Sequence, residues 1–365
     1  MKKFVTVCVM AVAAVAARNV VAAEQTDEAG VQTATDIRFV AVTNEPIAPP
    51  ASPAPDPICQ AGCAPLMCDG YAIPRIAASV NELYMQRHSP SDAVIFSGPS
   101  GATLLNASQF DFCYRPGIDA SLTYNRNCDY GIDLRYEWLA ESGADASFTF
   151  PAGVNHTNTT PPSYFGGGSG GAGHFDYQSG LQTAEVNLRK HFYWFDGLIG
   201  FRYADLGEGM NGAYTFHGLR GVETQSWNAQ NNLYGLQVGA DALLWQSCRG
   251  IRIDGYGKAG IYGNVEETQF QTNYIVGGSR FADADTTHAA FLGELGFTAS
   301  WQLTRHLAWQ TGYQMLWLDG VATAGKQVSA TGSANPPPLG ATTSHVDSAS
   351  TVFYQGFKSG LEVTW

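Results

Sequence analysis

Residues 354–365 read YQGFKSGLEVTW, and this stretch decides the fold. Apolar side chains occupy odd positions, among them Phe357, Leu361, Val363 and Trp365, while polar side chains such as Lys358 stand between them. A period of two over so many residues predicts a β-strand with one apolar and one polar face. The apolar face either packs on a second sheet in a soluble sandwich or faces lipid in a membrane barrel, and the rest of the sequence must decide.

The composition excludes several classes of protein. Charged residues make up only 14% of the 365 residues, whereas glycine occurs 41 times and aromatic residues reach 12%. Such a chain is poor in the Lys and Glu that solvated helices use. No apolar run reaches the roughly 20 residues of a membrane helix, so any insertion into a membrane must use strands. The formal net charge of -12, without a basic stripe, predicts no nucleic-acid partner.

The N-terminal region predicts export. Two lysines, an apolar run over residues 4–16 and small residues before Glu24 predict a signal peptide over residues 1–23, with cleavage after Ala17 as an alternative. Residues 24–74 have no period and contain a Pro/Ala run, so we expect a disordered periplasmic segment there. Residues 75–365 form the predicted membrane domain.

This domain contains about ten alternating stretches, each close to the 9 to 11 residues of a tilted membrane strand. In the stretch 130–138, Tyr130, Ile132 and Leu134 share one face while Asp133 and Arg135 share the other. The expected strands are 78–86, 117–124, 131–139, 183–191, 197–206, 232–245, 250–263, 290–303, 307–318 and the terminal strand.

The connections between these strands alternate in length. Turn-sized links lie at 125–129, 192–196, 246–250 and 304–306, whereas the others are long: 88–116, 140–180, 207–231, 264–289 and 319–351. Short periplasmic turns and long external loops are typical of outer-membrane barrels. The sequence therefore predicts an all-β fold, a closed antiparallel transmembrane β-barrel with both ends of the domain in the periplasm.

The terminal stretch gains its role from this fold. Because lipid offers no water to unpaired backbone groups, the last strand must pair with the first and close the sheet. We expect Phe357, Leu361, Val363 and Trp365 to face lipid and to act as the signal that the barrel-assembly machinery reads. Outer-membrane lipid is then the other predicted partner, and a homo-oligomer is possible.

The sequence resembles the outer-membrane β-barrel porins of planctomycetes, which are similar to the Legionella-type outer-membrane proteins. The resemblance rests on the signal peptide, GLIGFRYADLGEGM at 197–210, NLYGLQVGAD at 232–241 and the glycine-punctuated terminal strand, and it covers about residues 78–365. It implies an outer-membrane location and a barrel fold, and it supplies no catalytic residues.

The alternation also predicts which charged side chains face the lumen. They are Asp119, Asp133, Arg135, Glu137, Glu185, Arg189, Arg202, Asp241, Arg252, Asp254, Lys258, Glu294, Lys358 and Glu362. Because isolated charges in a narrow interior are costly, we expect pairs across strands, such as Arg135 with Glu185. The slight excess of acids predicts porin-like passive diffusion of small solutes with a weak cation preference. The alternative is a plugged barrel with a structural or surface-interaction role.

Other chemistry has weak support in the sequence. Asp283, Asp285 and His288 fall in one predicted external loop and could activate a water in a barrel-rim hydrolase, but loop acids are usually just solvated. We therefore predict that the chain is not an enzyme and binds no metal or cofactor. Cysteine connectivity cannot be read from the sequence; the six that follow the signal peptide are Cys59, Cys63, Cys68, Cys113, Cys128 and Cys248.

Overall fold

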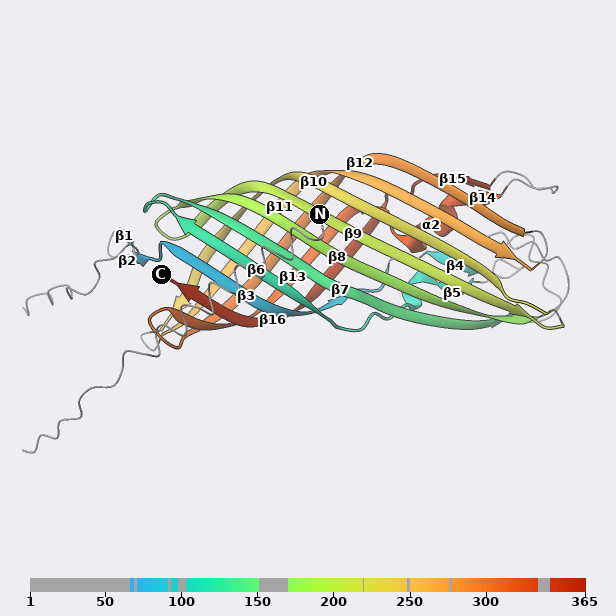
Figure 1. The fold of residues 1–365 in the computed structure, drawn as a ribbon, viewed down its shortest axis with the longest axis horizontal. Coiled ribbons are helices and arrows are strands. Elements are labelled where there is room, and N and C mark those ends of the chain that lie inside the picture. Colours follow the sequence, from blue (N-terminus) through green and yellow to red (C-terminus); the bar gives the residue numbers. More distant parts are fainter. Residues whose placement is uncertain are drawn as a thin grey trace, which may run out of the picture.

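Ten strands form one closed ring of antiparallel neighbours, which confirms the predicted barrel. In a computed structural model the described residues are 66–68, 71–90, 93–97, 103–150, 170–218, 220–247, 250–275, 278–333 and 342–365. The last strand pairs with the first, so that Phe357 lies opposite Tyr84 and Leu361 opposite Val80. Figure 1 shows the strands tilted around a long barrel, with the C-terminus at one end.

The elements follow the chain in a simple order. The barrel strands are β3 (Ile76–Arg87), β6 (Arg115–Asn125), β7 (Tyr130–Phe150), β8 (Gly171–His191), β9 (Asp196–Phe216), β10 (Glu223–Gln246), β11 (Ile251–Tyr274), β12 (Gly278–Gln302), β13 (Leu307–Val321) and β16 (Ser350–Thr364). The shorter elements are β1 (Leu66–Cys68), β2 (Tyr71–Ile73), β4 (Val94–Ser97), β5 (Thr103–Asn106), η1 (Ala107–Gln109), α2 (Ala324–Ala330), β14 (Thr331–Ser333) and β15 (Thr342–Ser344). Among the described residues, no helix has the length and apolar character needed to cross a membrane.

The expected strand lengths are wrong for six neighbouring strands. Strands β7 to β12 have 21 to 25 residues each. Most of the described residues in the predicted loops 140–180, 207–231 and 264–289 therefore belong to strands. The four turns fall where the sequence places them, and we call their end of the barrel the turn end and the opposite end the loop end. The residues predicted as loops extend the barrel wall at the loop end.

The outer surface changes character at one level around the barrel. Between this level and the turn end, outward side chains are apolar and exposed, as for Leu134, Ile199, Val238 and Phe297. We call this zone the outer apolar band. A ring of polar side chains borders it on β7 to β12, formed by Glu141, Gln182, Asp205, Asn232, Glu267 and Asp285. Asp205 accepts hydrogen bonds from Gln182 (2.6 Å) and Gln230, so the ring is linked across three strands.

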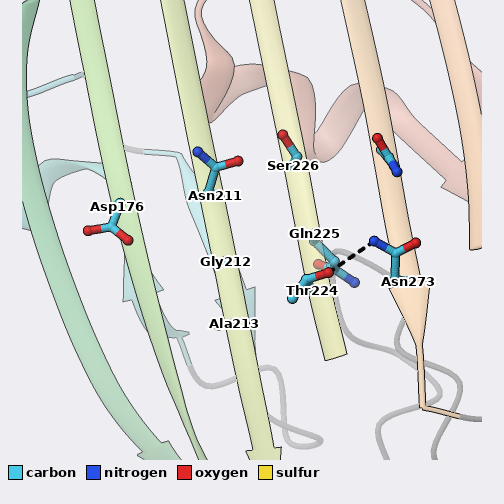
Figure 2. A pocket seen from close by; sticks show the side chains of 9 residues that line it. Asp176, Asn211, Gly212, Ala213, Thr224, Gln225, Ser226 and Asn273 are labelled. Carbon is cyan, nitrogen blue, oxygen red and sulfur yellow. Dashed lines mark hydrogen bonds between the residues drawn. The ribbon is translucent and has the colours of Figure 1, made fainter. Parts of the chain in front are cut away.

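Beyond this ring, the six long strands form what we call the extension. Its outer face is mostly polar, with Phe281 as a 58% exposed exception. A shallow pocket of about 310 Å³ on β8 to β11 is lined by Asp176, Asn211, Gly212, Ala213, Thr224, Gln225, Ser226, Gln271 and Asn273 (Figure 2). Asn273 donates a hydrogen bond to Thr224 across the strand pair at 3.1 Å. A wall of amides, hydroxyls and a carboxylate is suited to contact with water.

The inner face of the extension is apolar and packed. Phe175, Tyr214, Trp227 and Phe270 are at most 3% exposed, and the Trp227 and Phe270 rings lie 5.1 Å apart. The long connections from β3 to β6 and from β13 to β16 bring β4, β5 and α2 against this face, with Phe96 and Val328 inside the same cluster. Figure 1 shows these elements inside the loop end. The described residues of two predicted external loops, 88–116 and 319–351, therefore fill the barrel mouth.

The described residues cover only part of the predicted N-terminal regions. The signal peptide at 1–23 and residues 24–65 lie outside the described residues. Within the segment that the sequence predicts as disordered, β1 and β2 form a short antiparallel pair, with Met67 opposite Ala72. The barrel begins immediately afterwards, at Ile76.

Candidate functional site

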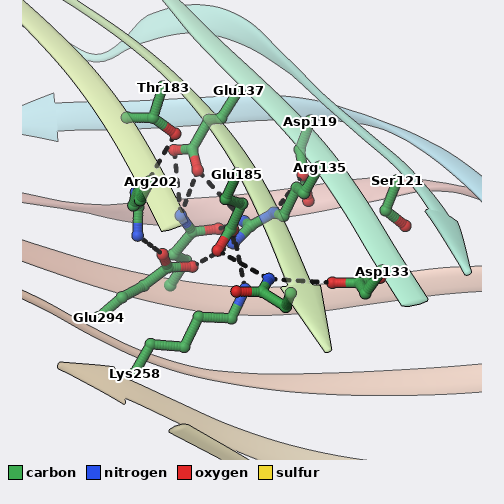
Figure 3. Close-up of polar contacts among 12 residues, drawn as sticks. Asp119, Ser121, Asp133, Arg135, Glu137, Thr183, Glu185, Arg202, Lys258 and Glu294 are labelled. Atoms are coloured by element: carbon green, nitrogen blue, oxygen red, sulfur yellow. Dashed lines mark hydrogen bonds and ion pairs between the residues drawn. The ribbon is translucent and has the colours of Figure 1, made fainter. Parts of the chain in front are cut away.

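The lumen is the best-defined candidate site, and a charged network centred on Arg135 crosses it. The Arg135 guanidinium contacts Asp119 on β6 at 2.6 Å and Glu294 on β12 at 2.5 Å. It also lies 3.2 Å from Glu137 and 3.4 Å from Glu185. Figure 3 shows these side chains converging from both sides of the lumen. Because β6 and β12 lie apart in the ring, the contacts bridge the interior rather than following one wall.

Three further cations complete the network. Arg202 pairs with Glu294 at 2.7 Å, Lys258 with Glu185 at 2.8 Å, and Lys358 lies 3.9 Å from Asp119. The network thus holds four bases and four carboxylates, and each of these residues is at most 9% exposed. Buried charges need such pairing, because an isolated ion in a protein interior loses several kcal/mol of solvation. The arrangement cancels most of the charge that an ion would meet.

A second polar cluster lies closer to the turn end. Arg189 contacts Asp196 at 3.0 Å and Asp241 at 2.6 Å, which separates two carboxylates that face each other across β9 and β10. Arg252 pairs with Asp254 at 2.7 Å, and its side chain is 46% exposed. These side chains are more solvated than those around Arg135, so this cluster forms the mouth of the lumen at the turn end.

Towards the loop end, an apolar layer lies above the Arg135 network. Leu83, Leu206, Leu233, Leu292 and Leu316 are each at most 1% exposed and belong to one packed cluster. Inward positions along β9 change from Arg202 to the apolar Ala204 and Leu206. The lumen is therefore filled by hydrocarbon at this level, since buried apolar side chains pack as densely as an organic crystal.

A buried polar knot above this layer holds the inserted helix. Glu208 accepts hydrogen bonds from Arg87 (2.6 Å), Tyr177 (2.5 Å) and Ser179 (3.1 Å). It also accepts one from the backbone N–H of Ala324, the first residue of α2, at 3.2 Å. One carboxylate thus connects β3, β8 and β9 to the segment that fills the loop end.

The tip of the extension contains an unpaired acid. Glu223 is 0% exposed, and neither carboxylate oxygen has a hydrogen-bond partner in the part of the chain that the structure describes. Burial raises the pKa of Glu223 from 4.5 to about 7, because a low-dielectric site disfavours the charged form. Tyr214 lies opposite it in the strand register. No charged group compensates Glu223 among the described residues, so its ionisation has to weaken the packing around it.

The structure thus places the fourteen predicted lumen residues in two groups. Nine are buried in or beside the Arg135 network, and Arg189, Asp241, Arg252, Asp254 and Glu362 lie nearer the turn end. Arg135 and Glu185 do contact each other. Sequence reasoning missed Arg87 and Glu208, although both continue the inward alternation of their strands by one step past the predicted ends.

The residues of the predicted assembly signal differ in exposure. Phe357 and Leu361 are 57% and 48% exposed on the outer face, but Val363 is only 9% exposed. Val363 lies between Leu307 and Ala78 in the register. Trp365 continues the pairing through two backbone hydrogen bonds with Ile76, of 2.8 and 2.9 Å.

The weak hydrolase constellation does not assemble. The residues expected in a loop lie on strand β12, where Asp283 and Asp285 share the outer face. His288 lies on the opposite face of the strand and, together with Asp347, lines a second pocket. The two acids and the histidine therefore do not converge. Among the described residues, no group of three or more His, Cys, Asp or Glu side chains could hold a metal ion.

Two described cysteines differ in redox state. Cys128, in the turn between β6 and β7, is disulfide-bonded, whereas Cys113 has a free, exposed thiol. Cys59, Cys63 and Cys248 lie outside the described residues.

Comparisons with known proteins describe the fold without naming a family. No protein-family model matches the chain, and no curated protein matches it. The outer-membrane protease OmpT from Escherichia coli is similar in structure, with a TM-score of 0.43 and 7% identity over 80% of this chain and 96% of that one. A FadL homologue from Pseudomonas aeruginosa gives a TM-score of 0.29 and 12% identity over 80% and 91% of the two chains. The anion-selective porin from Comamonas acidovorans gives 0.15 and 7% over 78% and 98%. Because all three TM-scores are below 0.5, the fold assignment rests on the hydrogen-bonded ring itself.

Proposed function

We propose that this chain is an outer-membrane β-barrel with a closed lumen, serving a structural or surface-interaction role. The observation that carries the proposal is the succession of buried layers along the lumen: the Arg135 network, the leucine layer, the Glu208 knot and the aromatic core of the extension. Each layer consists of side chains from several strands that contact one another across the interior. A solute would have to displace all four.

The two kinds of outer surface support the outer-membrane location. Lipid accepts apolar side chains such as Val238 and Phe297, and it strongly disfavours a polar wall such as that of the extension. We place the outer apolar band in the membrane, the turns in the periplasm and the extension outside the cell. The signal peptide predicted from the sequence gives the export that this location requires.

Passive diffusion with a weak cation preference, the first prediction from the sequence, has less support. It needs a continuous path and an excess of negative charge along it. In the Arg135 network four bases balance four carboxylates, so this level of the lumen would contribute little selectivity even if a path opened. The rim hydrolase is weaker still, because Asp283 and His288 stand on opposite faces of β12.

Single-channel recording in planar bilayers tests the proposal. The full-length protein, folded as judged by faster gel migration before boiling, should produce no conductance steps above those of empty bilayers. A variant that removes the knot, Glu208→Ala together with Arg87→Ala, serves as the matched comparison, because it releases α2 without touching the Arg135 network. Steady conductance from the unmodified protein would contradict the closed lumen and support the prediction of a porin.

A further inference from the structure

The turn between β8 and β9 carries the two most exposed aromatic side chains of the described residues. Residues 192–195 read FYWF, and Tyr193 and Trp194 are 89% and 71% exposed. The rings form a packed group, because Phe192 stacks on Phe195 at 4.7 Å and Phe195 lies 4.5 Å from Trp194. Amphipathic aromatic side chains gather where hydrocarbon meets lipid headgroups. We call residues 192–195 the aromatic turn.

Lys190 precedes the aromatic turn on the outer face of β8. It follows Leu188 in the outward alternation of the strand, and its side chain is exposed. Its ammonium lies 5.1 Å from the centre of the Phe192 ring and 5.8 Å from the centre of the Tyr130 ring. Tyr130 is also its register partner on β7. Aromatic faces attract a cation without neutralising its charge.

The Lys190 ammonium forms no ion pair or hydrogen bond with a described residue. Asp196, on the neighbouring strand, is engaged in the lumen mouth by Arg189 at 3.0 Å and His191 at 2.8 Å. The backbone carbonyl of Asp129 accepts a hydrogen bond from the His191 N–H at 2.8 Å, yet the exposed Asp129 carboxylate does not pair with Lys190. The three N–H donors of Lys190 are therefore free to bind an anion from outside the chain.

The height of Lys190 on the barrel matches the edge of the outer apolar band. On β8 the ring of polar side chains passes through Gln182, and Leu188 still lies in the band. The path from Gln182 to Lys190 covers about 26 Å along the strand, or about 20 Å of height at a tilt of about 40°. Apolar bands of membrane barrels are about 25 Å tall. With the band in the membrane, the ammonium reaches the phosphates of the periplasmic leaflet, as lysines near the ends of spanning segments do.

The two borders of the outer apolar band carry opposite charges. The border on the loop side contains four acids: Glu141, Asp205, Glu267 and Asp285. The described residues of the turns, together with the outward residue of β8 beside them, supply three bases and one acid: Arg126, Lys190, Arg305 and Asp129. An anionic headgroup is therefore favoured at the turn side and disfavoured at the loop side.

We propose that Lys190, Tyr130 and Phe192 bind the headgroup phosphate of an anionic phospholipid in the periplasmic leaflet; this rests on the membrane location proposed above. The ammonium donates hydrogen bonds to the phosphate oxygens, while the two aromatic rings and Leu188 contact the glycerol and the first methylenes of the acyl chains. A free anion would gain only the first of these contacts, at an exposed ammonium where water competes. The apolar surroundings thus select an amphiphile, and the charge selects its phosphate.

Native mass spectrometry of the full-length protein in detergent tests the site with two lipids of identical chains, dioleoylphosphatidylglycerol and dioleoylglycerol. The unmodified protein should bind the phosphate-bearing lipid about fivefold more tightly, the factor expected for one lysine at an anionic headgroup. Lys190→Gln should remove this preference, and Lys190→Arg should keep it. Arg280→Gln is the matched control, because the Arg280 guanidinium lies 5.3 Å from the Tyr274 ring at the tip of the extension. This control should leave the preference unchanged.

The readouts separate the lipid site from folding and from the closed lumen. Gel migration before boiling reports whether each variant has formed a barrel. Equal affinity of the unmodified protein for the two lipids, or an unchanged preference in Lys190→Gln, would contradict the site. Displacement of the lipid by an equal concentration of inorganic phosphate would show that the site recognises a free anion, so the lipid would be the wrong ligand. Steady conductance, or no mobility shift in the unmodified protein, would contradict the proposed function instead.

Discussion

The membrane part and the extension are built from the same strands with opposite polarity. On β10, Gln237 faces inward and is 1% exposed while its neighbour Val238 faces outward and is 58% exposed. Ten residues earlier on the same strand, Trp227 faces inward with 0% exposure and Asn228 faces outward. The alternation keeps its phase between the two points, so only the chemistry of the two faces is exchanged.

The reversal shows that the medium outside the barrel wall, lipid or water, determines which side chains face the interior. Where lipid covers the outside, the apolar residues are used there and the interior receives charges that must pair with one another. Where water covers the outside, the interior can be an ordinary apolar core. Buried side chains fill the lumen in both parts: Arg135 and its partners in the membrane part, and Trp227 and its neighbours in the extension.

We expect the largest loss of stability when the charged network in the lumen loses its central residue, Arg135. Arg135→Ala leaves Asp119, Glu294 and Glu137 without their shared cation, so we expect a loss of about 5 kcal/mol or a failure to fold. Urea unfolding in detergent, followed by the gel-mobility shift, measures it. Asp145→Asn on the exposed face of β7 is the control and should change little. A stable barrel with Arg135→Ala would show that the network does not hold the membrane part.

Disrupting the apolar core of the extension should unfold the extension alone. Trp227→Ala removes a fully buried ring from the extension, and such truncations cost about 3–5 kcal/mol. We expect proteases to cleave the extension while the gel-mobility shift of the barrel persists. Thr224→Ala, half-buried on the outer side of the same strand, should not alter cleavage. Loss of the mobility shift with Trp227→Ala would mean that the two parts fold as one unit.

The outer faces should respond oppositely to the same charge. Val238→Arg places a guanidinium on the lipid side and should cost about 3 kcal/mol, whereas Asn228→Arg on the extension should be nearly neutral. Refolding into phospholipid vesicles, measured as the midpoint in urea, compares the two. Equal midpoints would contradict the assignment of a lipid and a water side.

A smaller effect follows from Glu223. Since its folded pKa of about 7 lies above the ordinary 4.5, the protonated form favours the folded tip. Stability of the tip should therefore fall as the pH rises from about 4.5 to 7, by at most about 3 kcal/mol. Hydrogen exchange of the amides at the tips of β9 and β10, corrected for intrinsic rates, should show this slope. Glu223→Gln should abolish this pH dependence. An unchanged slope in the variant would show that another group causes it.

The same contrast explains what the sequence could and could not predict. The sequence predicts the strand at 131–139 directly, because Ile132, Leu134 and Trp138 alternate with the charged Asp133, Arg135 and Glu137. In the extension the inward residues are aromatic and the outward ones are small or polar, as at Phe148 and Ser147, and glycines interrupt the pattern. These stretches therefore resemble loops, although the alternation continues through them.

The site shows a similar division. Alternation was sufficient to place Arg135, Glu185 and Glu294 on inward faces, because facing depends only on local phase. It could not identify Gln314 as a partner of Arg135 or Ala324 as a partner of Glu208. Those contacts cross the lumen between strands that are distant in the sequence, so they depend on the diameter of the barrel and on the paths of the long connections.

The most direct test of the two-part wall is a spin-label scan along β10. In a background in which Cys59, Cys63, Cys68, Cys113, Cys128 and Cys248 are all replaced by serine, single labels at outward positions 224, 226, 228, 230, 232, 234, 236 and 238 are compared for collision with oxygen, which concentrates in lipid, and with a water-soluble nickel chelate. We predict that the nickel complex dominates at 224–230, that oxygen dominates at 234–238, and that the two cross near Asn232. Dominance of the nickel complex at all eight positions would contradict the membrane assignment and the account built on it.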